Sequence, residues 1–546
     1  MTAQRPQDPF SIPLFRRIWV ANIASQFGGL IQSVGAAWLM VQLGGSATQI
    51  ALVQASVTLP IMILSLLSGA IADNFPRRSV MLVSQVYMLM VSAIICLFAV
   101  YDGLTPWSLL AFTFLLGCGT ALNAPSWQAT VGDIVPRETL AAAVSMNSLG
   151  FNIARTAGPA LGGAIVAAAG AAAAFAVNVL SYIGIIYVLL AWRPEKPAQQ
   201  ALKEDLRSAI GAGVRYVSMS PPIRQVMARA ALFGLAASAA LSLLPLVAQE
   251  LLGGGAVTFG ILSGAFGIGA VIGALCNARL RRRFTAESIL RMTISMIIAG
   301  VVIVAVSRAL PLTVLGLVIC GSGWLLAMAT MNVTVQMAAP RWVVGRALSL
   351  YQMAVFGAMA VGSWITGQLA ESYGVTPALL TMAMVQSVSL FAGLLLRLPE
   401  VEAMNLDLTG RWRQPDMQVP VEPRSGPVHV SVRYQILEAD IPRFLAAMNE
   451  RRRIHLRDGA RAWSLVRDLA DREVWLEQYS FARWLDYVLH NERRTHADDI
   501  SNNIVRTLHQ GSWPPEVQRM LERQVISVTY DPELASPTSS DPTRPA

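Results

Sequence analysis

Apolar and polar residues alternate along this chain in long blocks, with twelve hydrophobic runs followed by a polar C-terminal region. A helix needs roughly 20 apolar residues to cross the hydrocarbon core of a bilayer. Lipid offers no hydrogen-bond partner to an open backbone, so each run is predicted to be a helix. The predicted spans are 17–43, 49–72, 79–101, 106–124, 141–168, 171–192, 226–249, 256–278, 287–307, 310–333, 345–370 and 376–397.

The second half of the hydrophobic region repeats the first. Asn123 aligns with Asn332 and Gly158 with Gly362, so six spans recur as six. Two parallel six-helix repeats are typical of transporters whose substrate site lies between the halves near the middle of the membrane. The expected domains are an N-terminal six-helix bundle (1–192), a cytoplasmic connector (193–224), a C-terminal six-helix bundle (225–397), a linker (398–426), an α+β domain (427–525) and a disordered tail (526–546).

Composition and charge agree with a membrane protein. Only 14% of the residues are charged, whereas a soluble protein carries about 25%. The cations gather in alternate loops, such as Arg77 and Arg78 after the second span and Arg281 to Arg283 after the eighth. Loops rich in cations stay in the cytoplasm. We therefore predict a multi-pass membrane protein with both termini cytoplasmic, and the net charge of +9 requires no nucleic-acid partner.

The sequence contains no pattern that calls for a metal or a cofactor. Cys96, Cys118, Cys276 and Cys320 lie within predicted spans at spacings that fit no metal site or disulfide framework. The chain has two lysines, and neither follows a glycine as a phosphate-binding loop requires. We therefore expect no metal, no cofactor and no ATP hydrolysis by such a loop.

The short connection between the second and third spans has a distinctive motif, in which Gly69, Asp73, Arg77 and Arg78 are regularly spaced. This motif resembles the loop signature of the major facilitator superfamily. The resemblance implies a cytoplasmic latch in which Asp73 faces the positive N-terminus of another helix and the arginines pair with it. The alternative is an ordinary short basic hairpin.

Small residues mark the fifth span. Gly158, Pro159, Gly162 and Gly163 resemble the G-P-x-x-G-G motif of exporters in the same superfamily, which implies export. Gly150 extends this stripe at helical spacing, and Gly362 occupies the matching place in the second half. Small residues at such spacing let helix backbones approach closely in lipid.

Arg155 lies near the middle of the fifth span, where an arginine costs about 2.5–3.5 kcal/mol. We expect it to line a wet cavity, where a fixed cation suits an anionic or oxygen-rich substrate; the alternative is a structural arginine bound to backbone carbonyls. The other expected cavity residues are Gln26, Gln32, Asn123, Gln128, Asn147, Ser148, Asn152, Asn332, Gln336 and Gln352. Proton antiport is the family expectation, but no membrane-central carboxylate identifies a proton carrier.

The polar C-terminal region predicts a small α+β domain. Residues 428–436 alternate between apolar and polar side chains as a half-buried strand does. A helix from Asp440, two strands around 470–472 and a helix over 481–509 give the order β-α-β-β-α of a ferredoxin-like unit. The domain resembles the antibiotic-biosynthesis monooxygenases, although its five histidines form no ligand spacing. Dimerisation or regulation is therefore favoured over catalysis.

The whole chain resembles the transmembrane secretion effectors related to the enterobactin exporter, a resemblance that the segment 13–29 supports. We therefore expect an all-α membrane transporter with a C-terminal ferredoxin-like α+β domain. It would lie in the bacterial plasma membrane and export a small amphipathic molecule, siderophore- or drug-like, by proton-coupled alternating access. The alternatives are an importer of the same fold and a membrane-tethered monooxygenase-like enzyme.

Overall fold

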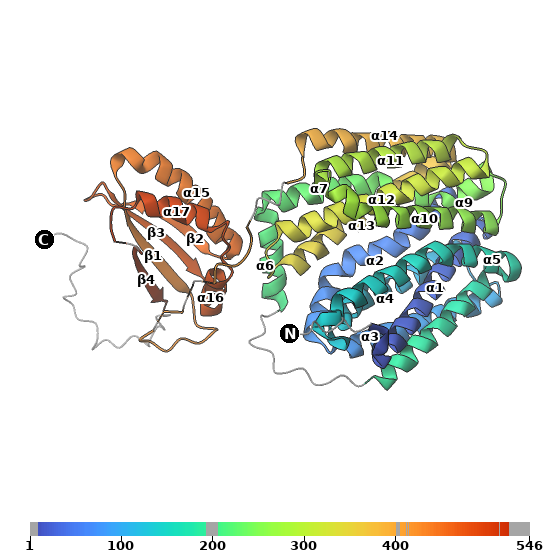
Figure 1. Cartoon of the computed structure of the whole chain (residues 1–546), viewed down its shortest axis with the longest axis horizontal. Coiled ribbons are helices and arrows are strands. Elements are labelled where there is room, and N and C mark those ends of the chain that lie inside the picture. Colours follow the sequence, from blue (N-terminus) through green and yellow to red (C-terminus); the bar gives the residue numbers. More distant parts are fainter. Residues whose placement is uncertain are drawn as a thin grey trace, which may run out of the picture. The chain divides into compact units, whose positions relative to one another are not determined.

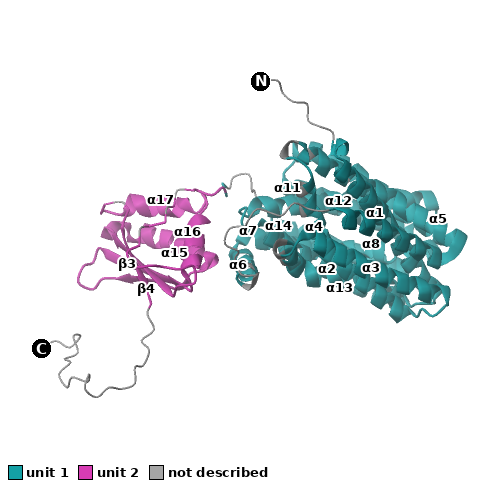
Figure 2. Ribbon diagram, turned by 90° about the horizontal axis from the view of Figure 1, so that it is seen from below, with its two compact units in different colours: residues 1–406 teal, residues 407–546 magenta. Residues whose placement is uncertain are grey.

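The computed structural model describes residues 9–192, 206–399, 405–410, 412, 414–415, 417–512 and 514–522. The chain forms two compact units, Met1–Leu406 (unit 1) and Asp407–Ala546 (unit 2), shown in different colours in Figure 2. The expected tail over 526–546 lies outside the described residues.

Unit 1 is a bundle of long helices (Figure 1). The long helices are α1 (Pro13–Gln42), α2 (Ala47–Asn74), α3 (Arg77–Val100), α4 (Pro106–Ile134), α5 (Arg137–Ala191), α7 (Pro221–Ala237), α10 (Ala256–Arg281), α11 (Ala286–Val306), α12 (Leu310–Ala338), α13 (Val344–Tyr373) and α14 (Val375–Leu395). Shorter pieces are α6 (Leu206–Met219) in the expected connector, and α8 (Ala239–Ser242), α9 (Leu244–Leu246) and a π-helical turn (Val247–Leu251) that prolong α7.

Among the described residues, ten helical segments are long and apolar enough to cross a membrane. One of them, Ala142–Ala191, has 50 residues. As a straight helix it would measure about 75 Å, more than twice the hydrocarbon thickness of a bilayer. A break at Gly170, with φ of 77° and ψ of 174°, divides it. Glycine adopts this backbone conformation without steric cost. α1, which corresponds to the first predicted span, is not among the ten.

The two halves of unit 1 use equivalent helix pairs. In the first half α1 packs on α5, α2 on α4, and α3 on α5. The second half repeats this arrangement, with α7 on α13, α10 on α12, and α11 on α14. The halves meet through α2 with α13 and through α5 with α10, and Figure 1 shows α2 beside α13. The repeat in the sequence therefore corresponds to a repeat in helix packing.

Glycines bring the paired helices together. A Cβ built on Gly158 would lie 2.9 Å from the Leu30 side chain of α1, and Gly150 and Gly162 also face α1. Between the halves, a Cβ on Gly163 would lie 2.7 Å from the Cα of Gly260 on α10. Backbone therefore contacts backbone where α5 meets α10. In the second half, Gly362 of α13 packs against the backbone of α7.

Unit 2 contains β1 (Val428–Gln435), α15 (Ile441–Asp458), β2 (Arg461–Arg467), β3 (Val474–Phe481), α16 (Trp484–Glu492), α17 (Asp499–Leu508) and β4 (Glu516–Leu521). The strands form an antiparallel sheet in the order β2-β3-β1-β4. The apolar face of β1, including Val430 and Tyr434, packs with Phe444 of α15 and Val505 of α17. The alternation in this strand thus directs one face toward the helices, and the other face carries polar side chains.

The expectation of a single helix over 481–509 is wrong. Phe481 belongs to β3, and the helical region is divided into α16 and α17. The division follows from local capping, because the backbone N–H of Thr495 donates to Asp498 Oδ2 (3.1 Å) while the N–H of Asp498 donates to Thr495 Oγ1 (3.3 Å). Such reciprocal bonds start a new helix.

Strand β4 was not expected. Trp412 and Val421, which belong to the expected linker, pack on the core of unit 2.

A fully buried carboxylate, Glu477 on β3, organises the interior of unit 2. Its oxygens accept hydrogen bonds from Tyr434 Oη (2.9 Å), Trp463 Nε1 (2.9 Å) and Arg451 (3.0 Å). His455 Nε2 lies 3.3 Å from the same carboxylate. A buried charge is tolerated only when it is paired and hydrogen-bonded in this way.

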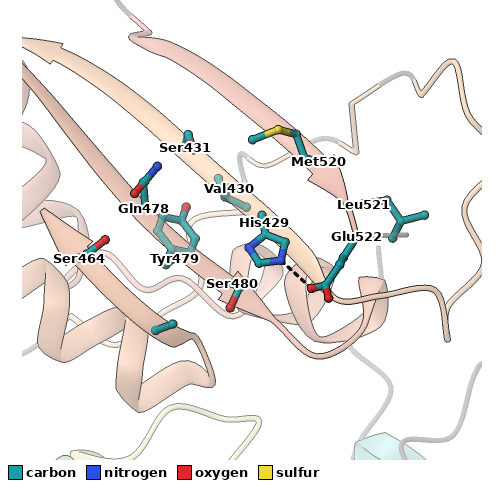
Figure 3. A pocket seen from close by; sticks show the side chains of 11 residues that line it. His429, Val430, Ser431, Ser464, Gln478, Tyr479, Ser480, Met520, Leu521 and Glu522 are labelled. Carbon is teal, nitrogen blue, oxygen red and sulfur yellow. Dashed lines mark hydrogen bonds and ion pairs between the residues drawn. The ribbon is translucent and has the colours of Figure 1, made fainter. Parts of the chain in front are cut away.

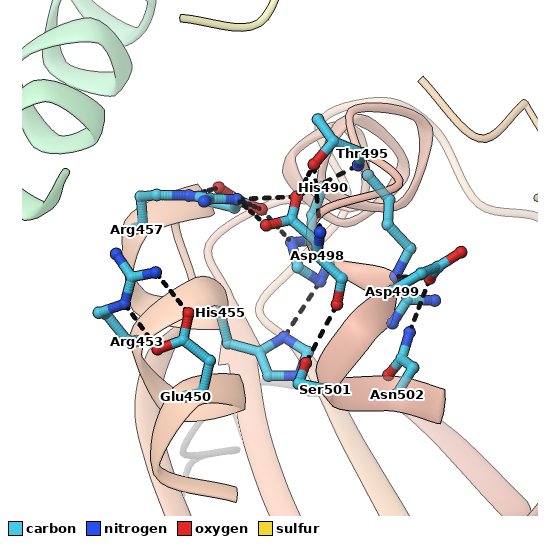
Figure 4. Close-up of polar contacts among 12 residues, drawn as sticks. Glu450, Arg453, His455, Arg457, His490, Thr495, Asp498, Asp499, Ser501 and Asn502 are labelled. Carbon is cyan, nitrogen blue, oxygen red and sulfur yellow. Dashed lines mark hydrogen bonds and ion pairs between the residues drawn. The ribbon is translucent and has the colours of Figure 1, made fainter. Parts of the chain in front are cut away.

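The polar network continues from His455 into the neighbouring helix. His455 Nδ1 lies 3.0 Å from His490 Nε2 (Figure 4), and His490 Nδ1 lies 3.5 Å from Asp458 Oδ2. Arg457 joins Asp458 (2.7 Å) to Asp498 (3.0 Å). Two imidazoles therefore lie in series between two buried carboxylates, although the histidine positions in the sequence suggested no such pairing.

Burial lowers the pKa of His455 to about 4, against the opposing charge of Glu477. For Glu477, burial alone would raise the pKa, but Arg451 and His455 outweigh it and hold the pKa well below its ordinary range. The pKa of Asp458 is likewise held low, because Arg457 and His490 outweigh its burial. The folded unit therefore keeps the carboxylates charged and His455 neutral.

We expect unit 2 to lose stability in mild acid. Unfolded His455 binds a proton near its ordinary pKa of 6.5, whereas the folded side chain resists protonation until about pH 4. The free energy of unfolding of unit 2 therefore decreases as the pH falls through this window, by roughly 3 kcal/mol for this side chain. Protonation of the carboxylates decreases it further at lower pH. Limited proteolysis of the detergent-solubilised full chain, followed at unit 2 from pH 7 to pH 4.5, measures this.

The matched variants for the acid experiment are His455→Gln and His429→Gln. Replacement of His455 should flatten the dependence between pH 7 and pH 4.5 even though it weakens the network at neutral pH. Replacement of the half-exposed His429 should leave the profile unchanged. Equal protease resistance of wild-type unit 2 at both pH values would contradict the expectation.

We further expect Gly163→Leu to destabilise unit 1, because a side chain there would push α5 away from α10. Overpacking of this kind costs about 1–3 kcal/mol. Gly184→Leu is the matched control, since no atom lies within 4 Å of a Cβ at this position of α5. The melting temperature of each variant in detergent, read by size-exclusion chromatography after heating, distinguishes them, and equal melting temperatures would argue against the close contact.

Candidate functional site

A cavity of about 180 Å³ lies between the two halves of unit 1. Side chains from α1, α2, α4 and α5 form one side, and residues from α8 to α10 form the other. Among the described residues that line it, Arg155 is the one that carries a charge. The other polar lining residues are Ser33, Gln54, Thr113, Ser242 and Ser263, and the rest of the wall is predominantly apolar.

Arg155 contacts aromatic rings that belong to the opposite half. Its guanidinium carbon lies 4.4 Å from the ring centroid of Trp324 on α12 and 5.8 Å from that of Phe266 on α10. A cation over an aromatic face is attracted by the electron density of the ring. No described carboxylate forms an ion pair with Arg155. The cation from α5 is therefore held against the second half by aromatic contacts.

The backbone around Arg155 also approaches the second half. A Cβ built on Gly267 of α10 would lie 2.6 Å from the carbonyl oxygen of Arg155. Gly264 faces the next carbonyl, that of Thr156, at 3.4 Å. Because α10 offers no side chain here, α5 can pass close enough for Arg155 to reach α12.

Two contacts join the halves at the end of the bundle where α1 is followed by α2. There Trp38 of α1 stacks on Phe259 of α10 with a centroid distance of 6.2 Å. Glu371 near the end of α13 accepts hydrogen bonds from the backbone N–H (3.3 Å) and the hydroxyl of Thr48 in the first turn of α2. A carboxylate at a helix N-terminus is stabilised by the helix dipole. We call this link between the halves the Thr48–Glu371 contact.

At the opposite end of the bundle, arginines bind the exposed carbonyls of helix C-termini. Arg78 donates to the carbonyls of Leu189 (2.8 Å) and Leu190 (3.1 Å) at the end of α5. Arg291 does the same in the second half, with Gly393 of α14 as its acceptor (3.0 Å). These bonds satisfy carbonyls that have no partner within their own helix.

The expected latch motif is only partly described. Gly69 of α2 lies beside Ser349 of α13, so the motif is close to the second half. Arg77 has an interaction partner as well. The side chain of Asp73 lies outside the described residues, so the latch stays a prediction.

A buried ion pair in the second half was missed at the sequence level. Arg229 of α7 is 0% exposed, and it lies 3.7 Å from Glu287 of α11 and donates to the carbonyl of Ser389 on α14. Arg291 also pairs with Glu287 at 2.8 Å. These contacts hold three helices of one half together. The available signal was the spacing of Glu287 and Arg291, which are four residues apart on one helix face.

Several of the residues expected to line the cavity lie elsewhere in the structure. Gln32 is buried between α1, α3 and α5, where its carbonyl oxygen accepts from Ser92 Oγ (2.7 Å) and from Asn178. It therefore serves helix packing within the first half. The described residues Gln26, Asn123, Gln128, Asn147, Asn152, Asn332, Gln336 and Gln352 do not border the cavity, and the side chain of Ser148 is outside the description.

Unit 2 has a separate hollow of about 330 Å³ on the sheet face that the helices leave open. Figure 3 shows polar side chains along it, with His429 Nε2 at 2.9 Å from Glu522 Oε2. Ser431 and Gln478 line the same hollow. Among the described residues, no group of three or more metal-binding side chains is placed to hold a metal ion.

Comparison with known proteins places these features in a family. A family model described as "Transmembrane secretion effector" matches residues 4–525. The multidrug efflux pump Tap of Mycolicibacterium fortuitum is 24% identical over 67% of this chain and 91% of its own length. The staphyloferrin A transporter of Staphylococcus aureus is 26% identical over 45% of this chain and 62% of its own length.

Solved structures agree on the fold of unit 1. A POT family transporter in complex with 5-aminolevulinic acid superposes with a TM-score of 0.58 at 14% identity, covering 71% of this chain and 99% of that one. The nucleoside transporter NupG gives a TM-score of 0.54 at 14% identity, covering 70% and 98%. Through a family match that extends over both units, the chain belongs to the transmembrane secretion effector family of multi-pass membrane transporters.

Proposed function

We propose that this protein exports a small amphipathic molecule, siderophore- or drug-like, by alternating access of its two halves. The observation that supports this most directly is the cavity between the halves, in which Arg155 is the one charged side chain that the structure describes. Relatives named as an efflux pump and a siderophore transporter support the substrate class. Coupling to proton antiport is the corresponding proposal for the energy source.

We also propose twelve crossings of the bacterial inner membrane, with both termini cytoplasmic. The break at Gly170 supports two crossings within α5, and the 30 residues of α1 are long enough for another. The cation-rich loops support the orientation. In this orientation the Trp38–Phe259 stack and the Thr48–Glu371 contact lie at the outer face, so the described conformation is closed to the outside.

For unit 2 we propose a ferredoxin-like domain that regulates the transporter or pairs with a second copy. The order of strands and helices and the sheet order β2-β3-β1-β4 support the fold. The polar open face of the sheet, where His429 and Glu522 lie, is the surface available for such pairing. A monooxygenase-like activity is the alternative, and oxidation of a quinol by the purified full chain would favour it.

Transport is tested in inside-out membrane vesicles. A deletion strain is first screened against siderophores and antibiotics, and the compound that accumulates in its cells is then offered to the vesicles. We expect accumulation inside vesicles that contain the wild-type protein, driven by an imposed proton gradient. Arg155→Ala should reduce the initial rate at least tenfold, whereas Arg281→Ala, at the exposed end of α10, should retain it. Uptake in the opposite direction would identify an importer.

The alternating-access proposal predicts that Glu371→Gln favours the outward-open state. The neutral amide loses the charge that stabilises the contact with the N-terminus of α2, and such contacts contribute about 0.3–1 kcal/mol. Spin labels placed at Gly45 and Tyr373 in a cysteine-free background should then report a larger share of long distances. Glu250→Gln is the matched control, since this exposed carboxylate makes no described ion pair. An unchanged distance distribution in Glu371→Gln would exclude the contact as a gate.

A further inference from the structure

The chemistry of the cavity defines the charge of its ligand. One guanidinium, from Arg155, lies in a wall made mostly of apolar side chains, with four hydroxyl groups and the amide of Gln54 as the remaining polar groups. In the described residues the partners of this cation are the faces of Trp324 and Phe266. Removing a charge from water is costly unless an opposite charge compensates it. The cavity therefore favours a ligand that brings one negative charge.

We propose that Arg155 binds the carboxylate of an amphipathic monoanion and that Trp324 is the positioning residue of this site. The proposal rests on the proposed transport function only for the role of the cavity, and it names the ligand class and the residues that select it. The apolar walls would contact an aromatic or branched hydrocarbon body, and the hydroxyl groups would bind further oxygen atoms.

The contact with Trp324 would hold the guanidinium of Arg155 in place for a ligand carboxylate. The guanidinium carbon lies over the Trp324 ring, 4.4 Å from its centroid. The N–H groups of arginine form a fork that matches a carboxylate. A contact with an aromatic ring supplies no carboxylate to this fork, so a ligand carboxylate can bind it. Trp324 is not among the described residues that line the cavity, so it would act through Arg155.

The same geometry excludes a second charge on the ligand. The described lining of the cavity contains no second cation that could pair with another carboxylate. A dianion would have to place its second charge against apolar walls such as those of Val53 and Leu244. The site should therefore discriminate by charge among molecules of the same shape.

Ligand binding at Arg155 is also linked to the relative position of the halves. Arg155 belongs to the first half, while Trp324 and Phe266 belong to the second. A carboxylate bound to a guanidinium that Trp324 holds in place would therefore bind most tightly while these contacts between the halves are made. Because a ligand shifts a conformational equilibrium by its different affinities for the two states, this preference would couple substrate binding to the relative position of the halves.

The binding test uses three probes of similar shape and different charge, namely benzoate, neutral benzamide and the dianion terephthalate. Radiolabelled probes are equilibrated with the purified full chain in detergent at pH 7 by dialysis. We expect saturable binding of benzoate to one site, with benzamide and terephthalate each at least tenfold weaker. Equal affinities for benzoate and benzamide would overturn the proposal.

Variants of Arg155 and Trp324 test whether these residues form the binding site. Arg155→Ala should weaken benzoate binding at least tenfold without changing the affinity for benzamide, and Arg155→Lys should restore part of the difference. Trp324→Phe should retain the preference for the anion, while Trp324→Ala should reduce it. Arg281→Ala serves as the control for loss of a cation elsewhere. Benzoate binding that is unchanged in Arg155→Ala would refute the assignment, and size-exclusion profiles check that each variant is folded.

The outcomes separate this inference from the transport proposal. Binding of benzoate that depends on Arg155, together with vesicles that transport no compound, would refute the proposed function and leave the anion site. Export of neutral or cationic compounds at rates unaffected by Arg155→Ala would refute the anion site and the role of Arg155 in transport, but it would leave export itself. Both proposals hold when the exported compound is a monoanion and its transport depends on Arg155.

Discussion

The close backbone contact between α5 and α10 is the constraint on which the rest of unit 1 depends. In lipid, apolar surface gains little by leaving its surroundings, so helices associate through close packing and polar contacts. Gly163 and Gly260 supply this packing between the halves, and Gly267 continues it beside Arg155. Any larger residue on this seam would separate the halves and widen the space in which Arg155 lies.

Arg155 reaches Trp324 because that seam is narrow. An arginine in the middle of a span needs a partner, and the described structure provides aromatic faces rather than a carboxylate. Arg229 of the second half instead lies 3.7 Å from Glu287 and donates to the carbonyl of Ser389. The two arginines therefore differ in their surroundings, because Arg229 has a carboxylate beside it and Arg155 has aromatic rings.

Unit 2 also contains ionisable side chains in its interior. Its interior contains Glu477, His455 and Asp458, and each is held by neighbours that fix its protonation state. Such a network stabilises the domain only while all of its hydrogen bonds are made. The family match extends across this domain as well as the helical bundle.

The sequence by itself determined the features that repeat at short range. The length of the apolar runs, the internal repeat, the glycine stripe around Gly158 and the alternation in β1 are all visible locally, because lipid and the pleat of a sheet act on every residue of an element. The family followed from such motifs. The isolated position of Arg155 in an apolar run also marked it as a member of the cavity.

Only the tertiary structure decided which side chains meet. Gln32 looked like a cavity residue until Ser92 and Asn178 were seen to bind it, and His455 and His490 carry no spacing that predicts their contact. Trp324 could not be assigned to Arg155, because the two residues belong to opposite halves. Each of these outcomes depends on which helix faces oppose one another, and that is a property of long-range packing rather than of any local pattern.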